Sequence, residues 1–172
     1  KITAPGFADF VQKDIEVAVG QQVDLLVKMA LANTTTAVEV VSAVPLVDNT
    51  KTEVSEVVGR RQIDELPING RRVDSFVLLT PGVTNDGTFG NLSFRGQNAG
   101  NAFLVDGNDT TNGFFVENAG RSRIPTQISQ DAVQEFQVLN SGYTAEFGRA
   151  SGGVVNTVTR SGSNELHGTA YW

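Results

Sequence analysis

The sequence changes character most sharply in the stretch Tyr143-Thr-Ala-Glu-Phe-Gly-Arg-Ala-Ser-Gly-Gly-Val-Val-Asn-Thr-Val-Thr159. Its first part belongs to the glycine-rich segment 141–153, which predicts a loop. Its second part, residues 154–159, is rich in β-branched side chains and predicts a strand. The glycine spacing fits neither a P-loop nor a dinucleotide fingerprint. We therefore expect close backbone packing, and no phosphate site, at Gly148, Gly152 and Gly153.

Strands and turns are predicted on both sides of this stretch. Ser129 is a predicted cap for a single helical turn, and residues 135–139 follow it as a strand. On the other side, residues 161–164 have the composition of a turn. Alternation of period two then resumes from Glu165 to Trp172, which predicts one more strand.

Further upstream, short regular elements alternate with polar segments. The patterns predict helices that stop before Pro67 and at Pro81-Gly82, and strands that run into Arg95-Gly96 and Asp106-Gly107 turns. The expected helices are 60–66 and 71–79, and the expected strands are 54–58, 91–95 and 102–106. Because helices do not alternate regularly with strands, we expect an α+β fold, a small mixed β-sheet with short helices and long Gly/Asn-rich loops.

The N-terminal region has a different pattern. Segments 15–19 and 23–29 alternate apolar and polar residues around the turn Gly20-Gln21-Gln22, which predicts a β-hairpin. A hairpin is marginal in isolation, so we expect it to belong to a β-sandwich with strands before Lys1. Residues 33–36 have the composition of a linker, and the β-branched run 38–41 predicts the next strand.

Bulk composition narrows the function classes. The net charge of −6 argues against nucleic-acid binding, and the absence of cysteine excludes disulfides and thiolate chemistry. No apolar run approaches the roughly 20 residues that a membrane helix needs. All four lysines lie at or before Lys51 and all nine arginines at or after Arg60, which favours two modules. Without an initiator methionine or a signal peptide, the chain is interpreted as an internal fragment.

From Val38 onward the order of motifs resembles the plug domain of TonB-dependent receptors. After a leading strand come Leu78-Leu-Thr-Pro-Gly-Val83, the strand Leu92–Gly96, the turn Leu104-Val-Asp-Gly107 and the closing signature 143–159. The hairpin before them, with its Ala4–Phe7 lead, is similar to the end of a carboxypeptidase-regulatory-like β-sandwich, as in the Oar-like subgroup. The resemblance implies the end of that sandwich at 1–36, the plug at 37–164 and the start of the first barrel strand at 165–172.

In that family the plug fills the lumen of an outer-membrane barrel of about 22 strands. The resemblance thus implies a gating domain that helps to bind ligand and opens when it is pulled from the periplasm, where its N-terminal part lies. Its implied partners are the chain's own C-terminal barrel, the periplasmic TonB protein and an unidentified ligand, and it implies no cofactor. The motif residues are Gly82, Gly96, Asp106, Gly107, Gly148, Gly152, Gly153 and Asn156.

The junction between the two modules resembles the energy-coupling box of these receptors. An extended, β-prone segment can add a strand to a partner, so that main-chain hydrogen bonds transmit a pull. The alternative is that this run is simply the first strand of the plug, since β-branched runs are common. The candidates for contact with TonB are Thr36, Val38, Val40, Val41 and Ser42.

Three charged residues are candidates for locking the plug to the barrel wall or to one another. They are Arg95, Glu146 and Arg149. Arginine suits such a site because its planar guanidinium binds a carboxylate with two parallel hydrogen bonds. The alternative is an ordinary solvated surface arginine, which contributes little.

A metal site and a catalytic site are both disfavoured. Asp106, Asn108 and Glu117 fall at positions 1, 3 and 12 of a calcium loop, but Thr111 stands where the loop needs glycine. An Asx-rich turn is the better account. His167 is the only histidine, and no Gly-x-Ser-x-Gly elbow accompanies it, so we expect no enzyme activity.

Two other readings of the whole chain stay open at the level of sequence. One is a self-standing β-rich adhesion or assembly module of the cell surface, with the N-terminal hairpin as an interaction edge. The other, weaker reading is a secreted polysaccharide-active enzyme with a pair of carboxylates that the sequence does not identify.

Overall fold

The computed structural model describes residues 1–13, 15, 17–25, 27–31, 52–68, 73–86, 91–111, 128–166 and 168–170. The chain divides into two compact units, Lys1–Thr50 and Lys51–Trp172. The run 38–41 and the linker 33–36 lie outside the described residues.

The N-terminal unit is held by two isolated antiparallel bridges, Ile2 with Phe10 and Phe7 with Leu31. A turn is present at the predicted place, where Gly20 has a φ of 66°. The predicted hairpin around that turn is not confirmed, because the described residues of this unit contain no strand and parts of the two segments lie outside them.

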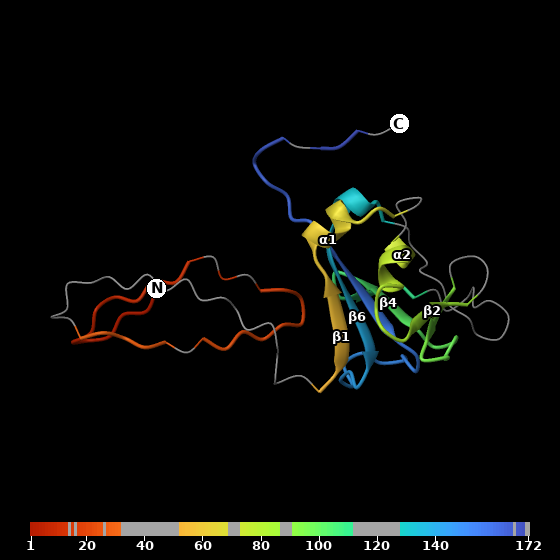
Figure 1. Cartoon of the computed structure of the whole chain (residues 1–172), viewed down its shortest axis with the longest axis horizontal. Coiled ribbons are helices and arrows are strands. Elements are labelled where there is room, and N and C mark those ends of the chain that lie inside the picture. The colour runs from red at the N-terminus through yellow and green to blue at the C-terminus, as the bar shows by residue number, and fades with distance from the viewer. Residues whose placement is uncertain are drawn as a thin grey trace. The chain divides into compact units, whose positions relative to one another are not determined.

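The second unit is built on a five-stranded mixed sheet (Figure 1). Strand β6 is antiparallel to both β1 and β7, whereas β4 is parallel to β7 and antiparallel to β5. A separate antiparallel pair joins β2 to β3. In spatial order the five strands are β1 (Val54–Val58), β6 (Val133–Ser141), β7 (Val154–Thr159), β4 (Ala102–Val105) and β5 (Asn108–Asp109), and the pair is β2 (Val83–Asn85) and β3 (Leu92–Phe94).

Short helices accompany the sheet. Helix α1 (Arg60–Glu65) starts after Gly59, whose N–H donates to the Gln62 side-chain oxygen at 3.0 Å and so satisfies one free donor at the helix start. It ends just before Pro67, as predicted. Helix α2 (Val73–Val77) and the 3-10 turn η3 (Gln130–Ala132) complete the set. The mixed sheet with few short helices confirms the core of the predicted fold class.

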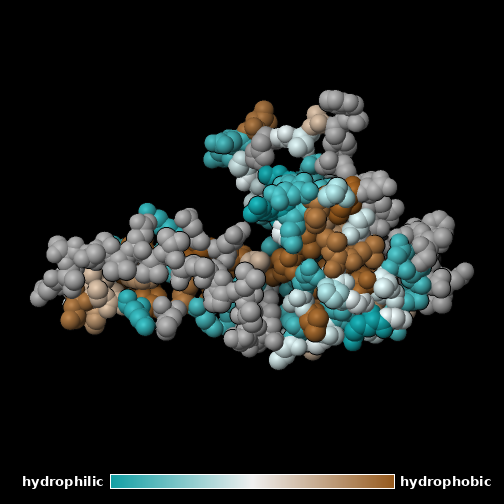
Figure 2. Space-filling view, viewed as in Figure 1, coloured by the Kyte–Doolittle hydropathy of each residue, from teal (hydrophilic) through white to brown (hydrophobic). Residues whose placement is uncertain are grey.

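The main core lies on one face of the sheet. Phe76 of α2 stacks on Phe136 of β6 with ring centroids 5.7 Å apart, and both side chains are fully buried. A smaller cluster on the opposite face joins Leu139 and Val154 to Tyr143 and other side chains of the segment after β6. Figure 2 shows apolar side chains also gathered at the surface over α2 and the strands beside it. The middle of β6 is therefore covered on both faces, and its buried residues include the polar side chains of Gln137 and Asn140.

The strand predicted beyond β7 is not confirmed by the described residues. Residues 165–172 were expected to form a strand, but the described ones, 165–166 and 168–170, form none, and Leu166 is fully exposed. A strand needs a neighbour for its backbone groups, and this segment has no ladder partner among the described residues. None of the helices in the described part of the chain has the length and apolarity to cross a membrane.

Substitution of Gly153, directly before β7, tests how closely the backbone packs against the Phe94 ring. Replacing Gly153 by alanine places a methyl group 2.2 Å from the fully buried Phe94 ring, so we expect a loss of about 2 kcal/mol in the free energy of unfolding. Gly148 is the matched control, because a methyl group there meets nothing within 4 Å, and its substitution should change stability by less than about 0.5 kcal/mol. Urea unfolding followed by circular dichroism measures both, and equal effects would contradict this packing.

Candidate functional site

The motif residues gather around the two ends of β7. At its start, Asn101 is 2% exposed and bridges two segments. Its side-chain N–H donates to the Leu92 carbonyl at 2.9 Å, and its side-chain oxygen accepts the Gly153 N–H at 3.0 Å. A side chain on Gly152 would strike that same oxygen of Asn101. The backbone packing predicted at Gly152 and Gly153 is therefore present, whereas Gly148 lies in open space.

The segment between β6 and β7 folds back onto its own glycines. The Tyr143 hydroxyl lies 2.9 Å from the Ala150 carbonyl and 3.2 Å from that of Gly152, and its ring meets Phe147 edge-on. The Ser151 and Gly152 N–H groups both donate to the Gly100 carbonyl. These contacts engage polar groups of the segment with one another and with Gly100, directly before β7 begins.

Two hairpin turns have the same geometry. Arg95 and Gly96 have φ of 53° and 78°, and Asp106 and Gly107 have φ of 50° and 79°. Positive φ at both central residues is typical of a type I′ turn, which matches the twist of the flanking strands. Glycine suits the second position because a Cβ there is unfavourable at such φ. The predicted Arg-Gly and Asp-Gly turns are thus explained by backbone conformation.

Asp106 ties its turn to the end of β7. Its two carboxylate oxygens accept the Thr159 N–H and the Thr159 hydroxyl, each at 2.8 Å. The Gly107 N–H donates to the Asn156 side-chain oxygen at 3.3 Å. The backbone N–H of Thr159, and then its hydroxyl, hold the pKa of Asp106 below its ordinary value. Both oxygens of the supposed first calcium ligand are therefore already engaged.

The calcium hypothesis gains no support. The described residues include no group of three or more acidic or histidine side chains that could hold a metal ion. Asp109 accepts the Thr111 N–H at 2.8 Å, which is the Asx-turn geometry that the sequence favoured. Glu117 and His167 lie outside the described residues.

The three lock candidates do not pair with one another. Arg149 forms an ion pair with Asp109, N to O 2.6 Å, on an exposed surface. Glu146 accepts a hydrogen bond from Thr144, two residues away. Among the described residues, the Arg95 guanidinium has only a long contact, 3.5 Å, to the Gly152 carbonyl. The coupling candidates Thr36, Val38, Val40, Val41 and Ser42 lie outside the described residues.

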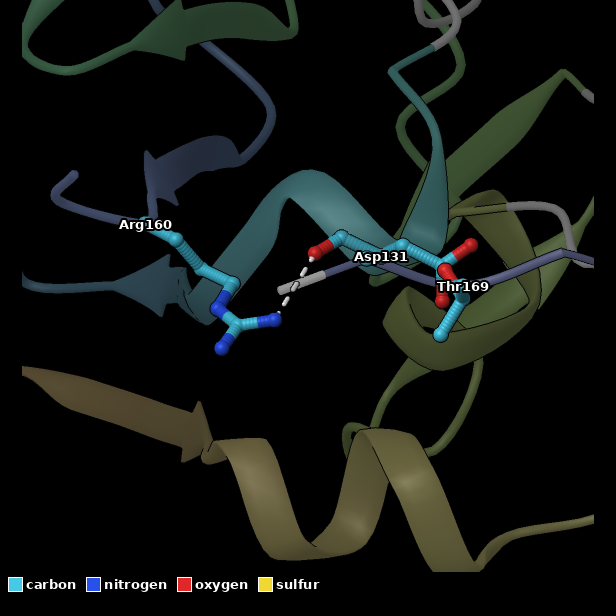
Figure 3. A pocket seen from close by; sticks show the side chains of 4 residues that line it. Asp131, Arg160 and Thr169 are labelled. Carbon is cyan, nitrogen blue, oxygen red and sulfur yellow. Dashed lines mark hydrogen bonds between the residues drawn. The ribbon is translucent and has the colours of Figure 1, made fainter. Parts of the chain in front are cut away.

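A cluster at the other end of β7 escaped prediction. The side chain of Arg60 donates to the carbonyls of Gln130 and Val133 at 3.1 and 2.7 Å. A surface pocket of about 330 Å³ lies close by, lined by Asp131, Arg160, Gly168 and Thr169 (Figure 3). Partners about 70 residues apart leave no local sequence signal. Only the position of Arg60 at the start of a predicted helix could have drawn attention to it.

The second unit thus combines a small mixed sheet, two turns with type I′ geometry and a glycine-rich segment between β6 and β7. The family model of the TonB-dependent receptor plug domain matches residues 47–155, more than half of the chain. The chain belongs to this family of outer-membrane receptor plugs, which is a transport family and not a family of enzymes. The resemblance read from the motifs is confirmed.

The sequence is similar to the TonB-dependent transporter Oar of Myxococcus xanthus, with 30% identity over 174 residues. That match covers 96% of this chain but only 16% of the relative, so the chain spans about a sixth of that protein.

Solved structures share the fold. One is a mutant of the ferric enterobactin receptor PfeA of Pseudomonas aeruginosa in complex with enterobactin, with a TM-score of 0.52, 20% identity, and 67% of this chain and 18% of that one covered. The siderophore receptor PirA of Acinetobacter baumannii has a TM-score of 0.52 and 24% identity, and the match covers 65% of this chain and 18% of that one. The outer-membrane transporter YddB of Escherichia coli has a TM-score of 0.53 and 20% identity, and the match covers 63% of this chain and 17% of that one.

The Asp106 contacts predict a pH dependence. Since its folded pKa is lowered, they stabilise the chain above the ordinary aspartate pKa of 3.8 and lose that effect as the pH falls through the folded value. Asp106→Asn should therefore cost up to about 1 kcal/mol at pH 7, after discounting for solvent exposure, and progressively less below about pH 4. Urea midpoints from pH 7 to pH 2.5 measure the difference. A constant difference over that range would show that the carboxylate charge is not involved.

Proposed function

We propose that this domain gates the lumen of an outer-membrane β-barrel, contributes to ligand binding, and opens when the periplasmic TonB protein pulls on its N-terminal side. The observation that carries the proposal is the plug match over residues 47–155, in a chain that spans about a sixth of its transporter relative. In this proposal the remainder of the protein supplies the barrel, and the N-terminal part lies in the periplasm.

The surface of the second unit supports this role. A plug in a wet lumen needs a folded core of its own and polar contacts to the wall. The main core is fully buried within the unit, while Glu146 is exposed and has no cationic partner among the described residues. Arg95 is likewise exposed, and within the part of the chain that the structure describes its guanidinium makes only the long contact to Gly152. We propose Glu146 and Arg95 as the polar contacts to the barrel wall. Arg149 is a weaker candidate, because it already forms an ion pair with Asp109.

Deleting the plug tests the gating role. In planar bilayers the full-length protein should show little conductance, and a variant lacking residues 52–164 should form large, unselective channels because nothing then fills the lumen. Deletion of residues 1–31 alone is the control and should leave the channel closed. In the same assay Glu146→Gln should raise the leak of the intact protein. A deletion variant with no pore would favour the adhesion or assembly module instead.

The coupling segment can be tested separately. We propose that residues 36–43 bind the TonB C-terminal domain by strand addition. Deleting them from the full-length protein should weaken that binding at least tenfold, whereas replacing the polar residues 33–35 by Gly-Ser-Gly should not. Isothermal titration with the purified TonB domain measures both. Unchanged affinity after the deletion would make this run simply the first strand of the plug.

A further inference from the structure

Three segments meet at the end of the sheet where β1 and β7 finish. Helix α1 follows β1 directly, η3 immediately precedes β6, and Arg160 follows the last residue of β7. In Figure 1, α1 and η3 lie together at this end, away from the loop that joins β6 to β7. The contacts among the three segments are made by two arginines and one glutamine.

Arg60 binds the η3 segment from the side of α1. Its guanidinium donates to the backbone carbonyls of Gln130, Asp131 and Val133 at 3.1, 3.5 and 2.7 Å. It also forms an ion pair with Asp64, N to O 2.7 Å, which orients it. The Arg60 side chain is only 23% exposed, so these charge-assisted contacts are partly shielded from water.

The other two contacts complete the connection. Arg160 donates its backbone N–H to the Ala132 carbonyl at 2.9 Å and its guanidinium to the Asp131 carbonyl at 3.4 Å (Figure 3). In return, the Gln130 side chain donates to the Ile63 carbonyl of α1. Arg60 and Arg160 therefore bind the same carbonyl, that of Asp131. We name the group of Arg60, Gln130, Asp131 and Arg160 the clasp.

The strand directions decide how tension acts on the sheet. Because β1 and β7 are both antiparallel to β6, they run the same way. The chain thus enters β1 at Val54 at one end of the sheet and leaves β7 at Thr159 at the opposite end. Inter-strand hydrogen bonds are perpendicular to the strands, so a pull between these two points shears them together and does not break them one by one.

We propose that the clasp transmits tension between β1 and the chain that leaves β7, and that it sets the force at which the sheet opens. Tension that enters at Val54 reaches Arg60 along β1, passes to the Asp131 carbonyl and continues into Arg160. The inference rests on the proposed function only for the origin of the tension, a pull on the N-terminal side against a C-terminal part held in the barrel.

Force spectroscopy on the full chain tests this path. The chain has no cysteine, so paired cysteine substitutions give unique attachment points. Handles at Thr52→Cys and Ser161→Cys load the clasp and shear the sheet. Handles at Thr52→Cys and Ala145→Cys instead peel β1 from β6, starting at the Val54–Ser141 pair and far from the clasp. All three positions are exposed.

In the shear geometry, Arg60→Ala should raise the rupture rate at constant force by about tenfold or more, as expected for the loss of one charge-assisted hydrogen bond. In the peel geometry the same substitution should leave the rate of the first rupture unchanged. Arg61→Ala is the matched control, because Arg61 is the next residue of α1, its side chain is 87% exposed, and it pairs with Glu65 in the same i,i+4 arrangement. It should change neither rate.

Two results would overturn the proposal. One is an unchanged rate for Arg60→Ala in the shear geometry, and the other is equal acceleration in both geometries, which would indicate a general loss of stability. If circular dichroism shows that Arg60→Ala does not fold, two other variants replace it. Gln130→Ala removes the hydrogen bond to Ile63 and Arg160→Ala removes the one to Asp131, and each should raise the rupture rate in the shear geometry alone. The measurement needs neither barrel nor TonB, so its failure leaves gating untouched, and a negative conductance result leaves the clasp untouched.

Discussion

The close approach of the Gly152–Gly153 backbone to Asn101 and Phe94 is the constraint on which the second unit depends. It fixes where β7 starts, and β7 is the strand that joins the antiparallel pair β6–β1 to the parallel neighbour β4. Because side chains alternate between faces, a shift of one residue at this point would move Val155 from the main core to the opposite face. The glycines therefore constrain the register of β7 against its neighbours β6 and β4.

The other end of β7 is held by different chemistry. There the Asp106 carboxylate binds Thr159, and the next residue, Arg160, binds the η3 segment. Steric fit governs the start of the strand and hydrogen bonding to charged groups governs its end. A force along the strand meets the second kind of contact, which can break and reform without repacking the core.

Local patterns predicted what is local in the structure. The β-branched runs at 54–58 and 154–159 match β1 and β7 residue for residue, and Pro67 ends α1 where expected. What the sequence did not contain is the spatial order, since β1 lies beside β6 from the other end of the domain. For the same reason the ion pair of Arg149 with Asp109 and the contacts of Arg60 could not be predicted. The lock candidates were proposed from residue type alone, and their partners depend on topology.

The hydrogen-bonding groups of the motif residues are largely used within the fold. Both oxygens of Asp106 bind Thr159, the Asn156 oxygen binds Gly107, and Gly153 gives its N–H to Asn101. A group engaged in this way has little left to offer a ligand, and freeing it would cost the fold an internal hydrogen bond. The engaged groups of these motifs therefore stabilise the fold and do not select a ligand. In the proposed transporter, we therefore expect ligand contacts to be made by residues outside these motifs.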